Sequence, residues 1–200
     1  MEAQKRLKQQ LDFLAEIDKM KSILRMNILI DRSRREDDAA HSWHMAMCAL
    51  VLFEHAKEPD LDLLKILKMC LVHDLVEIYA GDTYCYDQIG NQSKFAREQA
   101  SADRLFAQLP KEQGCEFRAL WDEFDRMETK EGLYAAAVDR IQPFLLNYHT
   151  DGHTWQFANV GVDDLLWRLA PVQDALPTLW EVLLDMIEDC RKRDLIPGER

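Results

Sequence analysis

The chain has 200 residues, and 48% of them are hydrophobic, which is enough to enclose one sizeable core. Acidic residues outnumber basic ones by 36 to 25, and the formal net charge of −11 argues against a long nucleic acid as a partner. The five cysteines are scattered and form no Cys-x-x-Cys pair, so we expect reduced thiols and a cytoplasmic protein. We expect no membrane association, because neither a signal sequence nor an apolar run of membrane-spanning length occurs.

Apolar residues at three- and four-residue spacing predict a succession of amphipathic helices. In chain order, the expected helices cover residues 3–22, 39–57, 61–80, 93–108, 111–127, 130–148, 162–170 and 177–192. Residues 22–36, where arginines accumulate, are expected to form a loop that ends at an N-cap, Asp37 or Asp38. Residues 82–92 predict a second loop, which either faces a substrate or is a plain surface loop. Asp151-Gly152-His153 indicates a turn, and no segment shows convincing strand alternation, so we expect an all-α fold.

The stretch from Leu71 to Asp82 places ionisable side chains in a run that otherwise suits a protein core. On a continuous helix ending at Gly81, Glu77 would lie over both His73 and Asp74, since residues three and four apart share a face. Burying these groups costs several kcal/mol unless a partner compensates them, and a divalent metal is the usual partner. The alternative is a hydrogen bond between a histidine and an aspartate in the core.

Two further positions bear on this choice. His41 and His44 lie one turn apart on the second expected helix, and each alone is typical of a core histidine. Asp139 interrupts an almost entirely apolar helix, so it needs either Arg140, which points about 100° away, or a cation from another helix. We favour the metal. Together His41, His73, Asp74 and Asp139 form a set of two imidazoles and two carboxylates that suits one divalent transition metal, Mn, Fe, Co, Ni, Zn or Cu.

The order His…His-Asp…Asp resembles the HD-domain metal-dependent phosphohydrolases. The segment from Arg35 to Ser42 looks like the Arg-x-Glu-Asn-x-(Ser/Ala)-Glu-His-Ser motif of the branch that includes the 5′-deoxynucleotidases, although Asp37 and Ala40 stand where that branch has Asn and Glu. Glu77 and Asp82 match its acidic residues four and nine positions after the second histidine. Asp139-Arg140-Ile141-Gln142-Pro143 fits its closing motif, and the likeness extends over about residues 20–150.

The resemblance implies an HD-domain helical bundle, which we expect to be a single domain over residues 1–200. Its metal-site core would cover about 22–150, and C-terminal packing helices would cover 162–193. Two-metal HD phosphodiesterases resemble this pattern but need histidines between Asp74 and Asp139, where this chain has none, so we expect one metal. Apolar helices at both ends predict a homodimer, which the resemblance also implies.

The implied activity is hydrolysis of a small nucleotide, a (deoxy)ribonucleoside 5′-monophosphate, to nucleoside and phosphate. By the same resemblance, Glu77 handles a proton and Asp82 contacts the sugar. Arg25 is the nearest match to the phosphate-binding arginine, with Arg34 as the alternative. Two other interpretations stay open: a pyrophosphohydrolase or triphosphohydrolase on the same scaffold, and a non-catalytic, metal-stabilised regulatory module.

Overall fold

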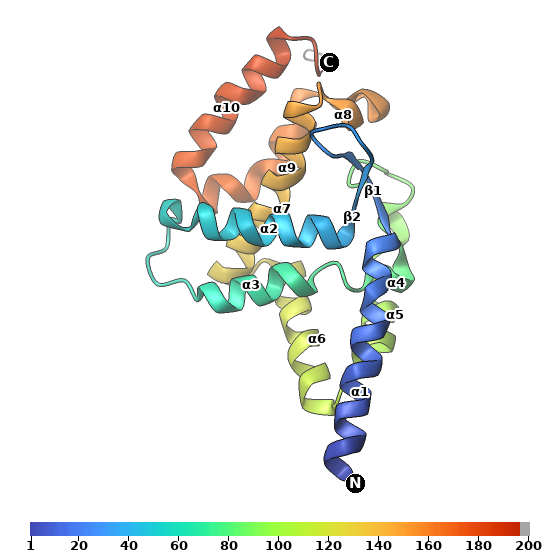
Figure 1. Ribbon diagram of the computed structural model, residues 1–200. Coiled ribbons are helices and arrows are strands. Elements are labelled where there is room, and N and C mark those ends of the chain that lie inside the picture. Colours follow the sequence, from blue (N-terminus) through green and yellow to red (C-terminus); the bar gives the residue numbers. More distant parts are fainter. Residues whose placement is uncertain (197–200) are drawn as a thin grey trace.

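The computed structural model describes residues 1–196, and most of this range is helical, as expected. Helices α2 (Asp38–Val51) and α3 (Leu63–Val72) lie one above the other, and α7 (Lys130–His149) contacts both (Figure 1). The other helices are α1 (Glu2–Glu16), η1 (Ile17–Ser22), η2 (Phe53–His55), α4 (Glu77–Ala80), α5 (Asn91–Phe106), α6 (Lys111–Arg126), α8 (His153–Ala158), α9 (Val162–Ala175) and α10 (Pro177–Lys192).

Helix α7 is the centre of the larger hydrophobic cluster. Its residues Ala135, Ala136, Ala137 and Val138 have no exposed surface, because α2, α3 and α9 all pack against it. Small side chains permit this close approach, and an apolar surface on every side is what a fully enclosed helix requires. Tyr134 at its start donates a hydrogen bond to the Ala49 carbonyl of α2 over 3.0 Å. The position of Asp139 in the middle of this helix is therefore fixed from several sides.

A small antiparallel sheet occupies part of the segment that the sequence predicts to be a loop. Strand β1 (Leu24–Ile28) pairs with β2 (Arg35–Asp37), with Leu24 opposite Asp37 and Ile28 opposite Arg35. The expectation of no strand was wrong because this sheet inverts the usual pattern. The polar residues Asn27 and Glu36 are buried, whereas Leu24 is 48% exposed, so no apolar alternation marks the strands.

The helix expected over 61–80 is interrupted, which is a second correction. Helix α3 ends at Val72, and the amides of Leu75 and Glu77 bond three residues back, to the carbonyls of Val72 and Asp74 over 3.1 and 2.9 Å. Glu77 then begins the short helix α4. The regular spacing that would stack Glu77 over His73 is therefore lost, and the tight turn directs Asp74 and Glu77 towards β1 and α2 instead.

The other helix boundaries agree with the predicted ones at some positions and differ from them at others. The Asp37 side chain accepts a bond from the Ala40 amide, which confirms it as the N-cap of α2. Helix α9 continues through Pro171 to Ala175, where the sequence predicts a stop at residue 170. A turn with positive φ at Asp151 and Gly152 is confirmed, but an unexpected helix, α8, follows it directly. The last helix, Pro177–Lys192, matches its prediction.

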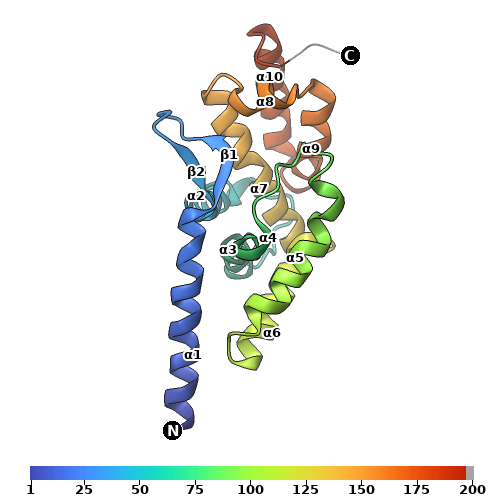
Figure 2. The ribbon, with the colours of Figure 1, turned by 90° about the vertical axis from the view of Figure 1, so that its right-hand side faces the viewer.

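Helix α1 extends away from the body of the molecule, and a 90° turn shows it on the opposite side from α5 and α6, with α3 and α4 between them (Figure 2). A second hydrophobic cluster, which includes Phe13, Val76, Leu105 and Trp121, joins these elements. Across residues 1–196, none of the helices combines the length and the hydropathy needed to cross a lipid bilayer.

Candidate active site

Four side chains from three parts of the fold converge beside α7. His41 lies on α2, His73 and Asp74 lie on the turn after α3, and Asp139 lies in the middle of α7. His41 Nε2 is 3.1 Å from Asp139 Oδ1 and 3.6 Å from Asp74 Oδ2. His73 Nε2 is 3.1 Å from Asp74 Oδ2 and 3.7 Å from Asp139 Oδ1. The structure thus brings all four predicted ligands together around one point, with both Nε2 atoms turned inwards.

The outer nitrogen of each imidazole has its own acceptor. His41 Nδ1 lies 2.8 Å from Gln142 Oε1, and His73 Nδ1 lies 3.0 Å from the Cys70 carbonyl oxygen. Gln142 is oriented by its amide, which donates to Glu36 Oε1 over 2.7 Å and lies 3.0 Å from His44 Nδ1. With Nδ1 protonated on both rings, each Nε2 presents a lone pair to the centre, which is the tautomer that a metal requires.

The ligand atoms gathered at this centre fit a metal ion. Among residues 1–196, the buried His73 Nε2 has no well-aligned hydrogen bond, and its neighbours within 4.0 Å are the carboxylate oxygens of Asp74 and Asp139, so a cation between these atoms would satisfy all of them. His41, His73 and Asp139 offer ligand atoms within 4.8 Å of one another, and all three residues are buried. Two imidazole nitrogens and two carboxylate oxygens in a buried pocket fit a divalent transition metal.

A second buried acidic group lies next to this centre. Asp38, Asp74 and Glu77 have oxygens within 4.8 Å of one another, and Arg25 from β1 supplies positive charge to them. Its Nη1 lies 2.8 Å from Asp74 Oδ2 and 3.5 Å from Asp38 Oδ1. Burial and the neighbouring Asp74 raise the pKa of Asp38 to about 7, and burial with Asp74 and Asp38 raises the pKa of Glu77. Glu77 is thus a carboxyl group that can retain a proton.

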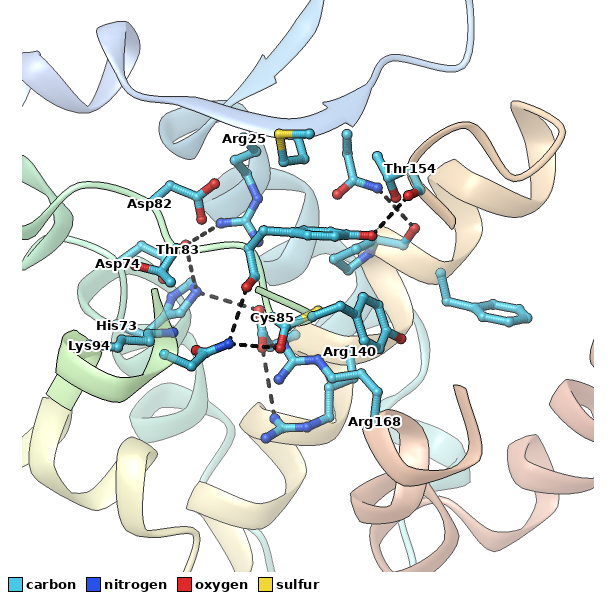
Figure 3. A pocket seen from close by; sticks show the side chains of 18 of the residues that line it. Arg25, His73, Asp74, Asp82, Thr83, Cys85, Lys94, Arg140, Thr154 and Arg168 are labelled. Atoms are coloured by element: carbon cyan, nitrogen blue, oxygen red, sulfur yellow. Dashed lines mark hydrogen bonds and ion pairs between the residues drawn. The ribbon is translucent and has the colours of Figure 1, made fainter. Parts of the chain in front are cut away.

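Arg25, Asp74 and Glu77 line a cleft of about 360 Å³, together with His73 and Asp139. The loop after α4 forms one wall, where Asp82 and Tyr84 line the cleft, and Arg25 lies next to Asp82 while Arg140 and Arg168 lie on another side of it (Figure 3). The loop therefore lines the cleft, whereas a plain surface loop would not. Of the two candidate phosphate arginines, Arg25 lines the cleft, but the side chain of Arg34 is 51% exposed and pairs with Asp37 outside it.

Two groups that contact the centre, Gln142 and Arg168, have no role assigned from the sequence, and Arg140 is considered there only as the less favoured partner of Asp139. Gln142 is noted there only as part of the closing motif, because a lone glutamine gives no chemical signal, although it lies three residues after Asp139 and so shares its face of α7. Arg168 Nη2 lies 3.1 Å from Asp139 Oδ2, but Arg168 belongs to a helix whose contact with α7 no local pattern predicts. Arg140 Nη1 approaches the same oxygen at 3.8 Å, so Asp139 has cations from its own helix and from another.

A helical bundle that gathers two imidazoles and two carboxylates beside a cleft with arginines defines the class of metal-dependent phosphohydrolases. The family profile described as HD domain matches residues 17–180. The chain therefore belongs to the HD-domain family.

Solved structures and curated proteins agree with this assignment. A predicted metal-dependent phosphohydrolase from Magnetospirillum magnetotacticum MS-1 is 39% identical with a TM-score of 0.91, covering 96% of this chain and 95% of that one. The 5′-deoxynucleotidase HDDC2 of Dictyostelium discoideum is 32% identical over 130 residues, 62% of this chain and 67% of its own length. Human 5′-deoxynucleotidase HDDC2 is 25% identical over 136 residues, 68% and 65% of the two chains. The chain thus spans about two thirds of the length of these curated relatives.

Proposed function

We propose that the protein hydrolyses deoxyribonucleoside 5′-monophosphates to nucleoside and phosphate, with one divalent metal held by His41, His73, Asp74 and Asp139. The observation that carries this proposal is the convergence of His41 Nε2 and His73 Nε2 on the carboxylates of Asp74 and Asp139, beside a cleft that Glu77 and Arg25 also line. The relatives named as 5′-deoxynucleotidases support the choice of substrate.

Each residue has a distinct role in this proposal. When bound, the metal would polarise the phosphoryl group and acidify a water molecule. Glu77, with its raised pKa and with Oε2 lacking a hydrogen bond among the described residues, would accept the proton of the attacking water or give one to the leaving group. Arg25 would hold the phosphate from the side of β1. Asp82 would contact the deoxyribose, because it lies on the cleft wall beside Arg25.

A screen of purified protein against deoxynucleoside and nucleoside 5′-monophosphates, with each candidate divalent metal in turn, tests the proposal. We expect release of inorganic phosphate and nucleoside, with the 2′-deoxy substrates preferred. Release of pyrophosphate or triphosphate from nucleoside triphosphates instead would point to a pyrophosphohydrolase or triphosphohydrolase on the same scaffold. A protein that binds metal but releases no product would be a regulatory module.

We also propose a single domain that forms a homodimer. One hydrophobic cluster joins residues of α2, α3 and α7 with residues of α9 and α10, which supports one folding unit. Helix α2 exposes Trp43, Met47 and Val51 at four-residue spacing, with exposed fractions of 64%, 38% and 65%, and this stripe would be covered in a dimer. Sedimentation equilibrium would distinguish a dimer from a monomer.

A cytoplasmic location is a further proposal, based on the five free cysteines. Fractionation of cells that produce the protein, followed by immunodetection, tests it.

A further inference from the structure

Arg140 and Arg168 form a pair of cations at one side of the cleft. Arg140 lies on α7 and Arg168 on α9, and their side chains are only 13% and 25% exposed. Both approach the same atom, Asp139 Oδ2, at 3.8 and 3.1 Å. Two guanidinium groups confined near one carboxylate oxygen repel each other.

The described residues leave this pair short of negative charge. Arg140 donates to the Ala136 carbonyl oxygen over 2.6 Å, and Arg168 makes its hydrogen bond only to Asp139, within residues 1–196. Asp125 also lines the cleft and acts on Arg140, but it lies beyond ion-pair distance. Burial raises the pKa of Cys85 near Arg168, so its thiol is neutral at pH 7. Two buried positive charges therefore face one carboxylate.

A bound metal would increase this deficit. The two positive charges of a divalent ion would balance the carboxylates of Asp74 and Asp139, and Arg140 and Arg168 would then have no anion of their own. Uncompensated buried charge is costly, so a ligand with two negative charges would restore the balance. A phosphate monoester carries such a charge near neutral pH, and guanidinium groups bind its oxygens in forked geometry.

Arg25 has the opposite surroundings. Its guanidinium lies within 4.0 Å of three carboxylates, with Nη1 near Asp74 and Asp38 and with Nε 3.7 Å from Glu36 Oε2. Its charge is thus matched by Glu36 and Asp38 even when Asp74 is counted with the metal, and Asp82 adds further negative charge on that side. The cleft therefore has an acidic side around Arg25 and a basic side around Arg140 and Arg168 (Figure 3).

We propose that Arg140 and Arg168 form an anion-binding subsite that neutralises the dianionic phosphate group of the ligand next to the metal centre, while Arg25 contacts the same group from the side of β1. As a subsite for the substrate of a nucleotidase, it rests on the proposed function. As a site for inorganic phosphate, it does not rest on the proposed function, because the deficit of negative charge around the two arginines is the same for any ligand that carries a phosphate group.

Binding of inorganic phosphate to the metal-loaded protein, measured by calorimetry, tests the subsite directly. We expect Arg168→Gln and Arg140→Gln each to weaken phosphate binding about 10- to 100-fold, as for loss of a charged hydrogen bond. Arg168→Lys should recover part of the affinity because it restores the charge. Arg126→Gln, which removes an exposed arginine of α6 outside the cleft lining, is the matched control and should change binding less than about 2-fold.

Metal content must be measured on the same samples, because Arg168 also bonds a metal ligand. Arg140→Gln separates phosphate binding from metal retention, because the Arg140 guanidinium lies farther from the Asp139 carboxylate than that of Arg168 does. If phosphate affinity falls only in proportion to lost metal, or if Arg140→Gln binds phosphate like the unaltered protein, the pair is structural and the subsite does not exist. If both variants lose phosphate affinity but no 5′-mononucleotide is hydrolysed by the unaltered protein, the subsite stands and the proposed function fails.

Discussion

Gln142 fixes the ring of His41 from the far side of the metal centre. Its Oε1 lies 2.8 Å from His41 Nδ1, and its amide is oriented by bonds to Glu36 and His44. Removing this acceptor should therefore leave the ring free to turn or to change tautomer, although no ligand atom is lost.

Replacing Gln142 by Leu should lower metal affinity about 10- to 100-fold, as is typical when an outer partner of a histidine ligand is removed. Competition with a fluorescent chelator measures this change. Gln156→Leu on α8 provides the control, because Gln156 is exposed and outside the cleft lining, and among the described residues its side chain bonds only to the Asp151 carbonyl. Equal metal affinity in Gln142→Leu and the unaltered protein would show that packing alone orients His41.

Asp139→Ala should lose most of the bound metal and most of the activity but keep its helical content. The carboxylate is a proposed ligand, whereas the surrounding α7 is held by buried apolar side chains such as Val138 and Ile141. Elemental analysis and circular dichroism on the same preparation test both parts. Full metal occupancy in this variant would remove Asp139 from the ligand set.

Glu77→Gln should keep the metal and the substrate affinity but reduce kcat by about 10²- to 10⁴-fold, the range for loss of a general acid or base. The amide retains the size of the side chain at a position that is only 4% exposed. Steady-state kinetics with a deoxynucleoside 5′-monophosphate, at matched metal content, measures the effect. An unchanged kcat would assign the proton transfer to another group.

Arg25→Ala and Arg34→Ala should differ in their effect on stability. Arg25 compensates buried carboxylates, with its own side chain 12% exposed, so its loss should lower the free energy of unfolding by about 3–5 kcal/mol. Arg34 pairs with Asp37 at the surface and should contribute less than about 1 kcal/mol. Denaturant titration of both variants provides the comparison. Similar losses in the two would mean that Asp38 and Asp74 protonate and do not need Arg25.

The residues of the site that the sequence reveals are those whose chemistry is unusual where they occur. A histidine, an aspartate or a glutamate within an apolar helix is a visible anomaly, so the amino-acid order alone selects His73, Asp74, Glu77 and Asp139. The helical succession follows from spacing, and the last helix matches residue for residue. Arg168 could not be selected in this way, since its significance depends on the packing of α9 against α7, a contact between segments distant in sequence.

The two main errors have a common physical origin. Periodicity assumes that apolar side chains face inwards and that a helix continues while its spacing continues. In β1 and β2 the buried positions are polar, and Glu36 accepts a hydrogen bond from Gln142. After Val72 the backbone leaves the helical path, while the apolar spacing continues through Leu75 and Val76. In both places the local structure brings polar side chains into hydrogen bonds and ion pairs, which patterns of hydropathy do not report.

The interruption between Val72 and Glu77 limits how this protein can be engineered for heat resistance. Substitutions chosen for helix propensity there would favour a continuous helix and could raise the melting temperature. The same change would rotate Asp74 away from Arg25, which it now contacts at 2.8 Å, and would move Glu77 out of the acidic group. We therefore expect stabilising mutations in this segment to cost metal affinity and turnover, whereas equivalent mutations on exposed positions of α10 should carry no such penalty.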